Sequence, residues 1–374
     1  MYLNVDEIES ALDALAAAYP GETEVLTPPH ATHGGRRARL LRIGKRPSDA
    51  DGVLVLGGVH AREWVPPDAL ISLAADLLEA SAGGTGLVYG STRYSAAQIR
   101  QVLDTVDLFL YPCVNPDGRA HSQATAAMWR KNRRPPPSGS RCAGVDLNRN
   151  FDFLWDHSAK FAADCDVRTS ANPCSDVYRG PDAGSEPETR NVVWALDTYP
   201  RIRWHLDVHS AVPVVLHVWG CDQIQTTDPG QDFRNPALDP VRGRPDDEIG
   251  EFMSGSDLAV TVALAERMDD AISGVRGVRY GVEPAYGLYP TSGTSDDYAY
   301  SRHKVDPRAG KVLGYTIECG ASFQPAWTEA EDVIREVSAA VIALALGAQE
   351  VIDGSRLQAA SPAIATVGDA SSPA

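Results

Sequence analysis

The chain has 374 residues, of which 43% are hydrophobic and 22% charged, as is typical of a globular protein with a large core. Its formal net charge of −16 argues against a nucleic-acid partner, and no apolar run approaches the roughly 20 residues of a membrane span. Residues 1–8 lack the basic and apolar regions of a signal peptide, so we expect a cytoplasmic protein if the chain is full-length and a secreted one if an export segment is missing.

Helices and strands are predicted to alternate along the chain. Apolar spacing and β-branched runs predict, in chain order, a helix over 5–19, strands over 37–43 and 53–59, a helix over 66–80, a strand over 105–111, a helix over 186–199, strands over 203–209 and 214–219, a helix over 258–273, a strand over 314–319 and a helix over 329–347. This alternation predicts an α/β fold, a single domain whose mixed, mostly parallel central sheet is flanked by helices on both faces.

The remaining segments are predicted to be irregular. The sequence Asn115-Pro-Asp-Gly118 is a strong turn signal, and 118–183 is a long stretch rich in Pro, Gly, Ser and Arg. Structureless connections of that length are usually functional. We expect a catalytic domain over 1–350, with a polar insertion or lid over 221–256 and a disordered tail over 351–374.

The six cysteines are too few for a disulfide scaffold. Cys142, Cys165 and Cys174 lie in or beside one loop-rich stretch and could pair locally if the protein is exported. The other three lie in or next to apolar, strand-like runs and are expected to be small buried residues: Cys113, Cys221 and Cys319.

Reactive side chains are predicted at the carboxyl ends of several strands, where open α/β sheets bind their ligands. His60 and Glu63 follow the strand over 53–59, His209 ends the strand over 203–209, and Glu318 lies in the last strand. Histidine and carboxylate are the ligand types of catalytic zinc, which uses three protein ligands. Asp207 could compete as a ligand or could be a partner of His209, because strand alternation places both on one face.

Several ordered motifs between about residues 5 and 347 resemble the zinc metallocarboxypeptidases related to pancreatic carboxypeptidases A and B. The motifs are His60-Ala-Arg-Glu-Trp64, Asn115-Pro-Asp-Gly118, Met128-Trp-Arg-Lys131, Gly144-Val-Asp-Leu-Asn-Arg-Asn150, His209-Ser210, Tyr289-Pro-Thr-Ser-Gly-Thr-Ser-Asp-Asp-Tyr298 and Thr316-Ile-Glu318. The resemblance implies that His60, Glu63 and His209 bind one zinc ion and that Glu318 is the general base and acid.

The resemblance also implies how a substrate is held. Arg130 resembles the arginine that stabilises the developing oxyanion. Arg149, with Asn148 beside it, resembles the clamp for a C-terminal carboxylate, and Tyr289 resembles the mobile tyrosine that caps the bound terminus. Arg62 is expected to face the penultimate residues of the substrate.

The side-chain pocket has its own implied residues. Counting from Tyr289 without gaps places Asp296 at the floor of the pocket, where an acid goes with Lys and Arg termini. Asp297 occurs in both subgroups of the family and is expected to be structural, and Gly220 falls where the family keeps a small residue.

We therefore predict a zinc-dependent exopeptidase that removes C-terminal amino acids, preferably Arg or Lys, from peptides or proteins. We expect a monomer without a nucleic-acid or membrane partner. Two alternatives remain at this point: a zinc amidohydrolase or cell-wall peptidase on the same fold, and a catalytically dead module that binds C-terminal peptides.

Overall fold

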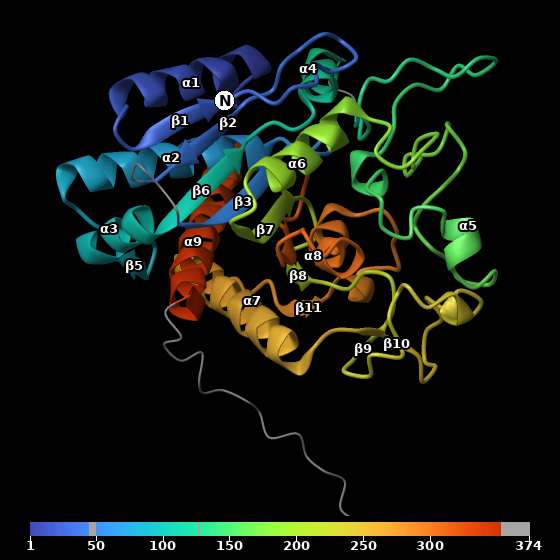
Figure 1. Ribbon diagram of the computed structural model, residues 1–374. Helices are drawn as coiled ribbons and strands as arrows, with labels where there is room; N and C mark the ends of the chain where they lie inside the picture. Colours follow the sequence, from blue (N-terminus) through green and yellow to red (C-terminus); the bar gives the residue numbers. More distant parts are fainter. Residues whose placement is uncertain (45–49, 126–127, 353–374) are drawn as a thin grey trace, which may run out of the picture.

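A computed structural model describes residues 1–44, 50–125 and 128–352 of the protein, which is built on an eight-stranded mixed sheet (Figure 1). The strands of this sheet, from edge to edge, are β1 (Thr23–Leu26), β2 (Leu40–Ile43), β6 (Val106–Tyr111), β3 (Asp51–Gly57), β7 (Ile202–His209), β12 (Leu313–Glu318), β8 (Val214–His217) and β11 (Val282–Pro284). Two small pairs lie outside it: β4 (Leu87–Tyr89) with β5 (Thr92–Tyr94), and β9 (Ile224–Thr226) with β10 (Gly250–Phe252).

The centre of the sheet is parallel. Strands β6, β3, β7 and β12 run in one direction, whereas β2 and β8 run antiparallel to their neighbours β6 and β12. The carboxyl ends of β3, β7 and β12 therefore lie next to one another at one edge of the sheet, which is where the predicted site residues cluster.

Helices cover both faces of the sheet (Figure 1). They are α1 (Val5–Ala18), α2 (Val65–Gly83), α3 (Ala96–Thr105), α4 (Pro116–Thr125), α5 (His157–Lys160), α6 (Pro187–Thr198), α7 (Gly255–Arg276), α8 (Ser295–Val305) and α9 (Trp327–Ile352), with the short 3-10 turns η1 (Leu147–Arg149), η2 (Pro236–Leu238) and η3 (Ala285–Gly287). Within the described ranges, none of these helices is both long and apolar enough to cross a membrane.

Strand alternation divides the core into two layers. Val53 and Val55 of β3 pack with α2, α3, α7 and α9 on one face, and Leu54 and Leu56 pack with α6 and α8 on the other. In β7, Leu206 and Val208 point to the first layer, so the alternate residues, which include His209, point toward the α8 face. The predicted fold class, a mostly parallel mixed sheet flanked by helices, is confirmed.

One local prediction was wrong. Asn115-Pro-Asp-Gly118, predicted as a turn, begins helix α4. The Asn115 side chain accepts a hydrogen bond from the Gly118 amide at 2.9 Å, as an N-cap residue does, and Pro116 takes the first helical position. The same residue types start turns and cap helices, so the following chain decides between the two structures.

The polar segment 221–256 packs against α8 rather than standing apart from the fold. Nζ of Lys304, at the end of α8, donates to the Phe252 carbonyl at 2.6 Å and lies 3.2 Å from a carboxylate oxygen of Asp232. Four aromatic rings surround this ammonium group at 4.4–6.0 Å, those of Trp219, Phe233, Phe252 and Tyr300. The disordered tail was predicted to begin at residue 351, but residues 351 and 352 belong to α9; the rest of the predicted tail lies outside the described residues.

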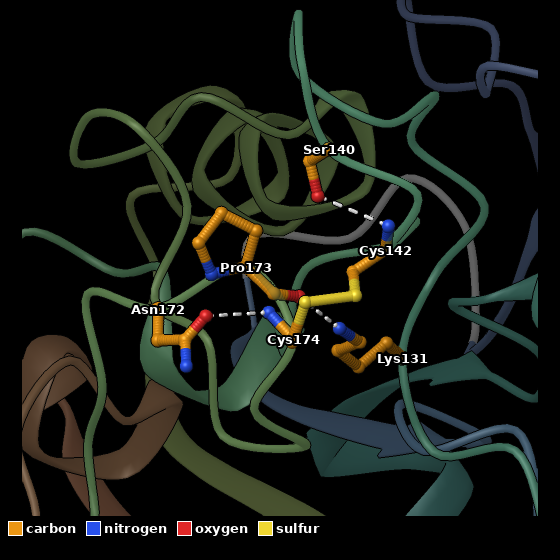
Figure 2. Close-up of a disulfide and its surroundings, with 6 residues drawn as sticks. All are labelled: Lys131, Ser140, Cys142, Asn172, Pro173 and Cys174. Atoms are coloured by element: carbon orange, nitrogen blue, oxygen red, sulfur yellow. Dashed lines mark hydrogen bonds between the residues drawn. A yellow bond between two sulfur atoms is a disulfide. The ribbon is translucent and has the colours of Figure 1, made fainter.

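A disulfide joins Cys142 to Cys174 within the irregular region (Figure 2). Beside it, Nζ of Lys131 donates to the Pro173 carbonyl at 2.8 Å. The bridge thus fastens the loop that contains Cys174 next to the segment that contains Arg130. Cys165, also predicted as a candidate for local pairing, is a free thiol, whereas the three cysteines predicted to be buried are buried: Cys113, Cys221 and Cys319.

Candidate active site

The three predicted metal ligands lie together at the carboxyl ends of β3 and β7. His60 follows β3, Glu63 precedes α2, and His209 is the last residue of β7. The Nδ1 atom of His60 lies 2.8 Å from Glu63 Oε1 and 2.9 Å from the Nδ1 atom of His209, which in turn lies 3.0 Å from Glu63 Oε2. All three side chains are buried, with relative exposures of 1–3%. Their ligand atoms lie within 4.8 Å of one another.

In both histidines, Nε2 contacts a carboxylate, whereas Nδ1 faces the other two predicted ligands. Nε2 of His60 lies 3.1 Å from Asp146 Oδ1, and Nε2 of His209 lies 3.0 Å from Asp207 Oδ2. When Asp146 and Asp207 accept the Nε2 protons of the two histidines, both Nδ1 atoms can present lone pairs to one point beside the carboxylate of Glu63. Electron-rich atoms this close need a cation, either protons or a metal ion, to offset their repulsion. Two imidazoles and one carboxylate are the donor set of a catalytic zinc ion.

Asp146 is a site residue to which the sequence analysis assigned no role. Besides His60, it accepts a hydrogen bond from Nε of Arg130 at 2.9 Å and one from the backbone amide of Asn148 at 3.1 Å. It lies inside the motif over 144–150, so the only signal available was its position between residues that were assigned. Its carboxylate connects a metal ligand, an arginine and the start of η1.

Glu318 reaches the metal ligands through the parallel pairing of β12 with β7. In this register Glu318 lies opposite His209, and the Cys319 amide donates to the His209 carbonyl at 2.7 Å. The Glu318 side chain lines a cavity that also contains His60 and Arg130. Burial, reinforced by the nearby carboxylate of Glu63, raises the pKa of Glu318 to about 7. Such a group exchanges protons near neutral pH, as a general base must.

Arg130 also lines this cavity. Its Nε bond to Asp146 orients the guanidinium, and its own carbonyl accepts a hydrogen bond from the Ala61 amide at 3.0 Å, one residue after His60. The side chain is 9% exposed, so its charge acts in a medium of low polarity. A charge held there can stabilise an oxyanion.

Arg149 and Asn148 come from the short turn η1, and both line the cavity. Arg149 donates through Nε to the Arg168 carbonyl and through Nη1 to the Asn148 carbonyl, so backbone oxygens hold its fork in one orientation. The ring of Tyr289, which also lines the cavity, has its centre 5.9 Å from the Arg149 guanidinium. The structure thus places the predicted carboxylate clamp and its tyrosine side by side.

Asp296 lies in the first turn of α8 and is 3% exposed. Its Oδ2 accepts from the Thr316 hydroxyl at 3.1 Å and its Oδ1 from the Asp297 amide at 2.9 Å, and it forms no ion pair with any residue in the part of the chain that the structure describes. The cavity that it lines is small, with a volume of about 30 Å³. Its walls mix polar and apolar side chains, including Leu216, Ala285, Leu288, Thr291 and Thr316.

Gly220 packs behind two residues that line this cavity, Thr291 and Ala285. The Gly220 amide lies 3.0 and 3.1 Å from the two carboxylate oxygens of Asp297, which is fully buried. A Cβ atom at Gly220 would lie 2.5 Å from the Thr291 hydroxyl, so glycine is required by this close approach. Asp297 has this contact within the protein, which matches the structural role expected for it.

Arg62 is the one predicted substrate residue that does not line the cavity. Its guanidinium lies 4.3 Å from the centre of the Phe323 ring, and Nη1 lies 3.9 Å from a carboxylate oxygen of Asp176. It therefore lies beside the cavity rather than in it, which leaves a role toward penultimate residues as a prediction.

The sequence of the chain matches one protein family over most of its length. The family described as zinc carboxypeptidase matches residues 8–339. Carboxypeptidase B of Astacus astacus is 30% identical over 319 residues, which are 85% of this chain and 86% of that protein. Carboxypeptidase B of Homo sapiens is 27% identical over 72% of this chain, but the match spans only 53% of the human protein.

The fold also matches solved structures. Bovine thrombin-activatable fibrinolysis inhibitor, solved in complex with tick carboxypeptidase inhibitor, superposes with a TM-score of 0.70 over 95% of this chain and 98% of that one. The identity is 20%, so this likeness concerns the fold alone.

Proposed function

The chain belongs to the zinc carboxypeptidase family, and from that premise we propose that it removes the C-terminal amino acid from peptides, with a preference for arginine and lysine. The observation that carries the preference is Asp296, a buried carboxylate without an ion-pair partner among the described residues, in the cavity that also contains the predicted carboxylate clamp and base.

The predicted catalytic groups, Glu318 and Arg130, line the same cavity as the zinc ligand His60. When bound, zinc supplies Lewis acidity that makes water nucleophilic at neutral pH and polarises the scissile carbonyl. Glu318 accepts the proton of the attacking water at a carboxylate oxygen and returns it to the nitrogen of the leaving amine. Arg130, oriented by Asp146, stabilises the negative charge that develops on the carbonyl oxygen, a contribution of about 3 kcal/mol for one such donor.

Arg149 accounts for the exopeptidase activity in this proposal. Its Nε and one hydrogen of Nη1 are used by backbone carbonyls, which leaves Nη2 and the second hydrogen of Nη1 for the two oxygens of a carboxylate. Tyr289, beside this guanidinium, can cover the bound terminus. A substrate that continued past this point would have no charge for Arg149 to bind.

Asp296 would select the side chain of the terminal residue. The hydroxyl of Thr316 and the amide of Asp297 are neutral donors, so they leave the negative charge of Asp296 uncompensated. The guanidinium of arginine or the ammonium of lysine would neutralise it, whereas the side chain of phenylalanine or leucine would leave a buried charge unpaired.

The test compares matched peptides that end in Arg, Lys, Phe or Leu, together with the metal content of the purified protein. We expect bound zinc and the highest kcat/KM for Arg and Lys. Asp296→Asn should lower kcat/KM for the Arg peptide by roughly 100-fold, since truncating one partner of a buried charge pair costs that much or more, and should spare the Phe peptide.

Two results would contradict the proposal. Faster cleavage of Phe or Leu than of Arg would show that Asp296 does not set the preference. A purified protein that neither binds zinc nor cleaves any of the peptides would exclude the peptidase activity itself.

A further inference from the structure

We propose that Asp207 is a positioning residue for the zinc ligand His209 and that a buried hydrogen-bond chain from His205 through Ser295 holds Asp207 in place. The inference rests on the zinc centre of the proposed function and concerns residues outside the three ligands. All of the side chains in the chain are buried, with exposures of 0–1%.

The hydrogen bonds of this chain have a defined direction. The Ser295 hydroxyl donates to Asp207 Oδ2 at 2.7 Å, so it is left to accept from Nε2 of His205, 3.1 Å away. Nε2 of His209 lies 3.0 Å from the same Asp207 oxygen. Donors from both sides therefore converge on Oδ2, which is an acceptor for each.

The neighbours of His209 leave Asp207 as the acceptor for its outer proton. With Nδ1 turned toward the metal, Nε2 carries hydrogen and needs an acceptor. The side-chain amide nitrogen of Asn148 is the other close polar atom, at 3.4 Å. That nitrogen is itself a donor, because the Asn148 oxygen accepts the Ser295 amide at 2.8 Å. Among the described residues, the proton can only go to Asp207.

The second oxygen of Asp207 shows what compensates its charge. Oδ1 is buried and has no hydrogen-bond partner in the described part of the protein. A buried carboxylate with one oxygen that accepts no hydrogen bond lowers the stability of the fold unless positive charge lies close by. An imidazole that coordinates a divalent cation carries such charge, so zinc binding and Asp207 stabilise each other.

The same chain reaches the specificity pocket. Ser295, which bonds Asp207, immediately precedes Asp296, and its amide is bonded to Asn148 in the wall of the cavity. The position of the zinc ligand is therefore coupled to the first turn of α8, where the pocket floor lies.

The experiment measures zinc affinity by competition with a chromophoric chelator, for the wild type, Asp207→Ala and Asp207→Asn. We expect Asp207→Ala to bind zinc roughly 10- to 100-fold more weakly, the usual effect of removing a carboxylate that orients a metal-bound histidine. Asp207→Asn keeps an oxygen that can accept from both donors, so it should lose less.

Asp296→Asn is the matched control, since it alters another buried carboxylate, one that forms no hydrogen bond with a predicted zinc ligand. Its zinc affinity should equal that of the wild type; a loss as large as that of Asp207→Ala would overturn the proposal. So would an Asp207→Ala protein whose zinc affinity is within about twofold of the wild type.

Ser295→Ala provides a second route if Asp207→Ala does not fold. It keeps the carboxylate but removes one hydrogen bond to it, and we expect a loss of zinc affinity of about fivefold; an unchanged affinity would overturn the role of the chain. A wild type that binds no zinc would instead refute the proposed function, whereas tight zinc binding by both wild type and Asp207→Ala would refute only this inference.

Discussion

The position of Glu318 at the end of β12 raises the pKa of its carboxyl group. A glutamate in water has a pKa of about 4.5, whereas burial and the neighbouring carboxylate of Glu63 raise the pKa of Glu318 to about 7. Only the deprotonated form can accept a proton from water, so activity is lost as the pH falls through this pKa. A bound zinc cation favours the charged form and lowers the pKa, which makes 7 the upper limit for the acid limb of the profile.

At the residue scale we therefore predict a wild-type kcat/KM that declines about tenfold per pH unit on the acid side of a pKa between 4.5 and about 7. Glu318→Gln should lose roughly 100- to 10,000-fold of kcat across the pH range while it keeps one zinc ion, because only proton transfer is removed. Pre-steady-state kinetics and metal analysis check both parts. A variant that retains full turnover, or that loses zinc together with turnover, would contradict the role of Glu318.

Residue types and strand ends were enough to predict the metal ligands and the base. The carboxylates that contact the two histidine ligands could not be assigned in the same way. His60, Glu63, His209 and Glu318 follow or end apolar strands, a signal that is local in sequence. Asp146 lies 86 residues from His60, and nothing in either segment indicates the 3.1 Å contact between them. For Asp207, alternation gave the correct face but could not distinguish a ligand from a partner, since that depends on which ring nitrogen faces the metal.

At the scale of elements, α8 performs two tasks with its two ends. Asp296, in the first turn, lines the cavity, and Lys304, in the last turn, holds segment 221–256 through its aromatic surroundings and Asp232. The helix was not predicted, because its residues are mainly polar and lack helical periodicity. Its packing against β12 and β7 compensates for this weak local signal.

Lys304→Met should lower the free energy of unfolding by about 2 kcal/mol, since it removes a buried ion pair and leaves Asp232 with Arg234 as its remaining partner. Urea unfolding measures the change. Lys311→Met is the matched control, because the Lys311 side chain is 47% exposed in its pair with Asp257 and should cost no more than about 0.5 kcal/mol. If both substitutions lower the free energy of unfolding by the same amount, Lys304 does not hold segment 221–256 against α8.

At the scale of the whole molecule, the site joins parts of the chain that are far apart in sequence. Its predicted ligands come from the ends of β3 and β7, its predicted base from the end of β12, and its predicted clamp from η1. The alternation of helices and strands was sufficient to predict the sheet and its layers. The loops that carry Arg130 and Arg149 have no periodicity, so their course could not be predicted and depends on specific contacts such as the disulfide (Figure 2).

Because the predicted zinc ligands follow or end two strands that are far apart in sequence, bound zinc should stabilise the folded protein as a whole. Removal of the metal with a chelator should lower Tm by several degrees, and added zinc should restore it, since a ligand that binds only the folded state stabilises that state. Differential scanning calorimetry with and without chelator checks this, and His209→Ala should show no such dependence on the chelator. A wild-type Tm that is the same with and without chelator would contradict the prediction.

The close packing around Gly220 limits how the specificity of this protein could evolve. An added methyl group would meet the Thr291 hydroxyl at 2.5 Å and Asp297 at 3.3 Å, so this wall has no room to narrow the pocket by gradual substitution. A lineage that changed its preferred terminal residue would instead have to alter side chains that line the cavity, such as Asp296, Leu216 and Thr316. Natural variation among relatives with the same glycine should therefore concentrate at the lining positions rather than at Gly220.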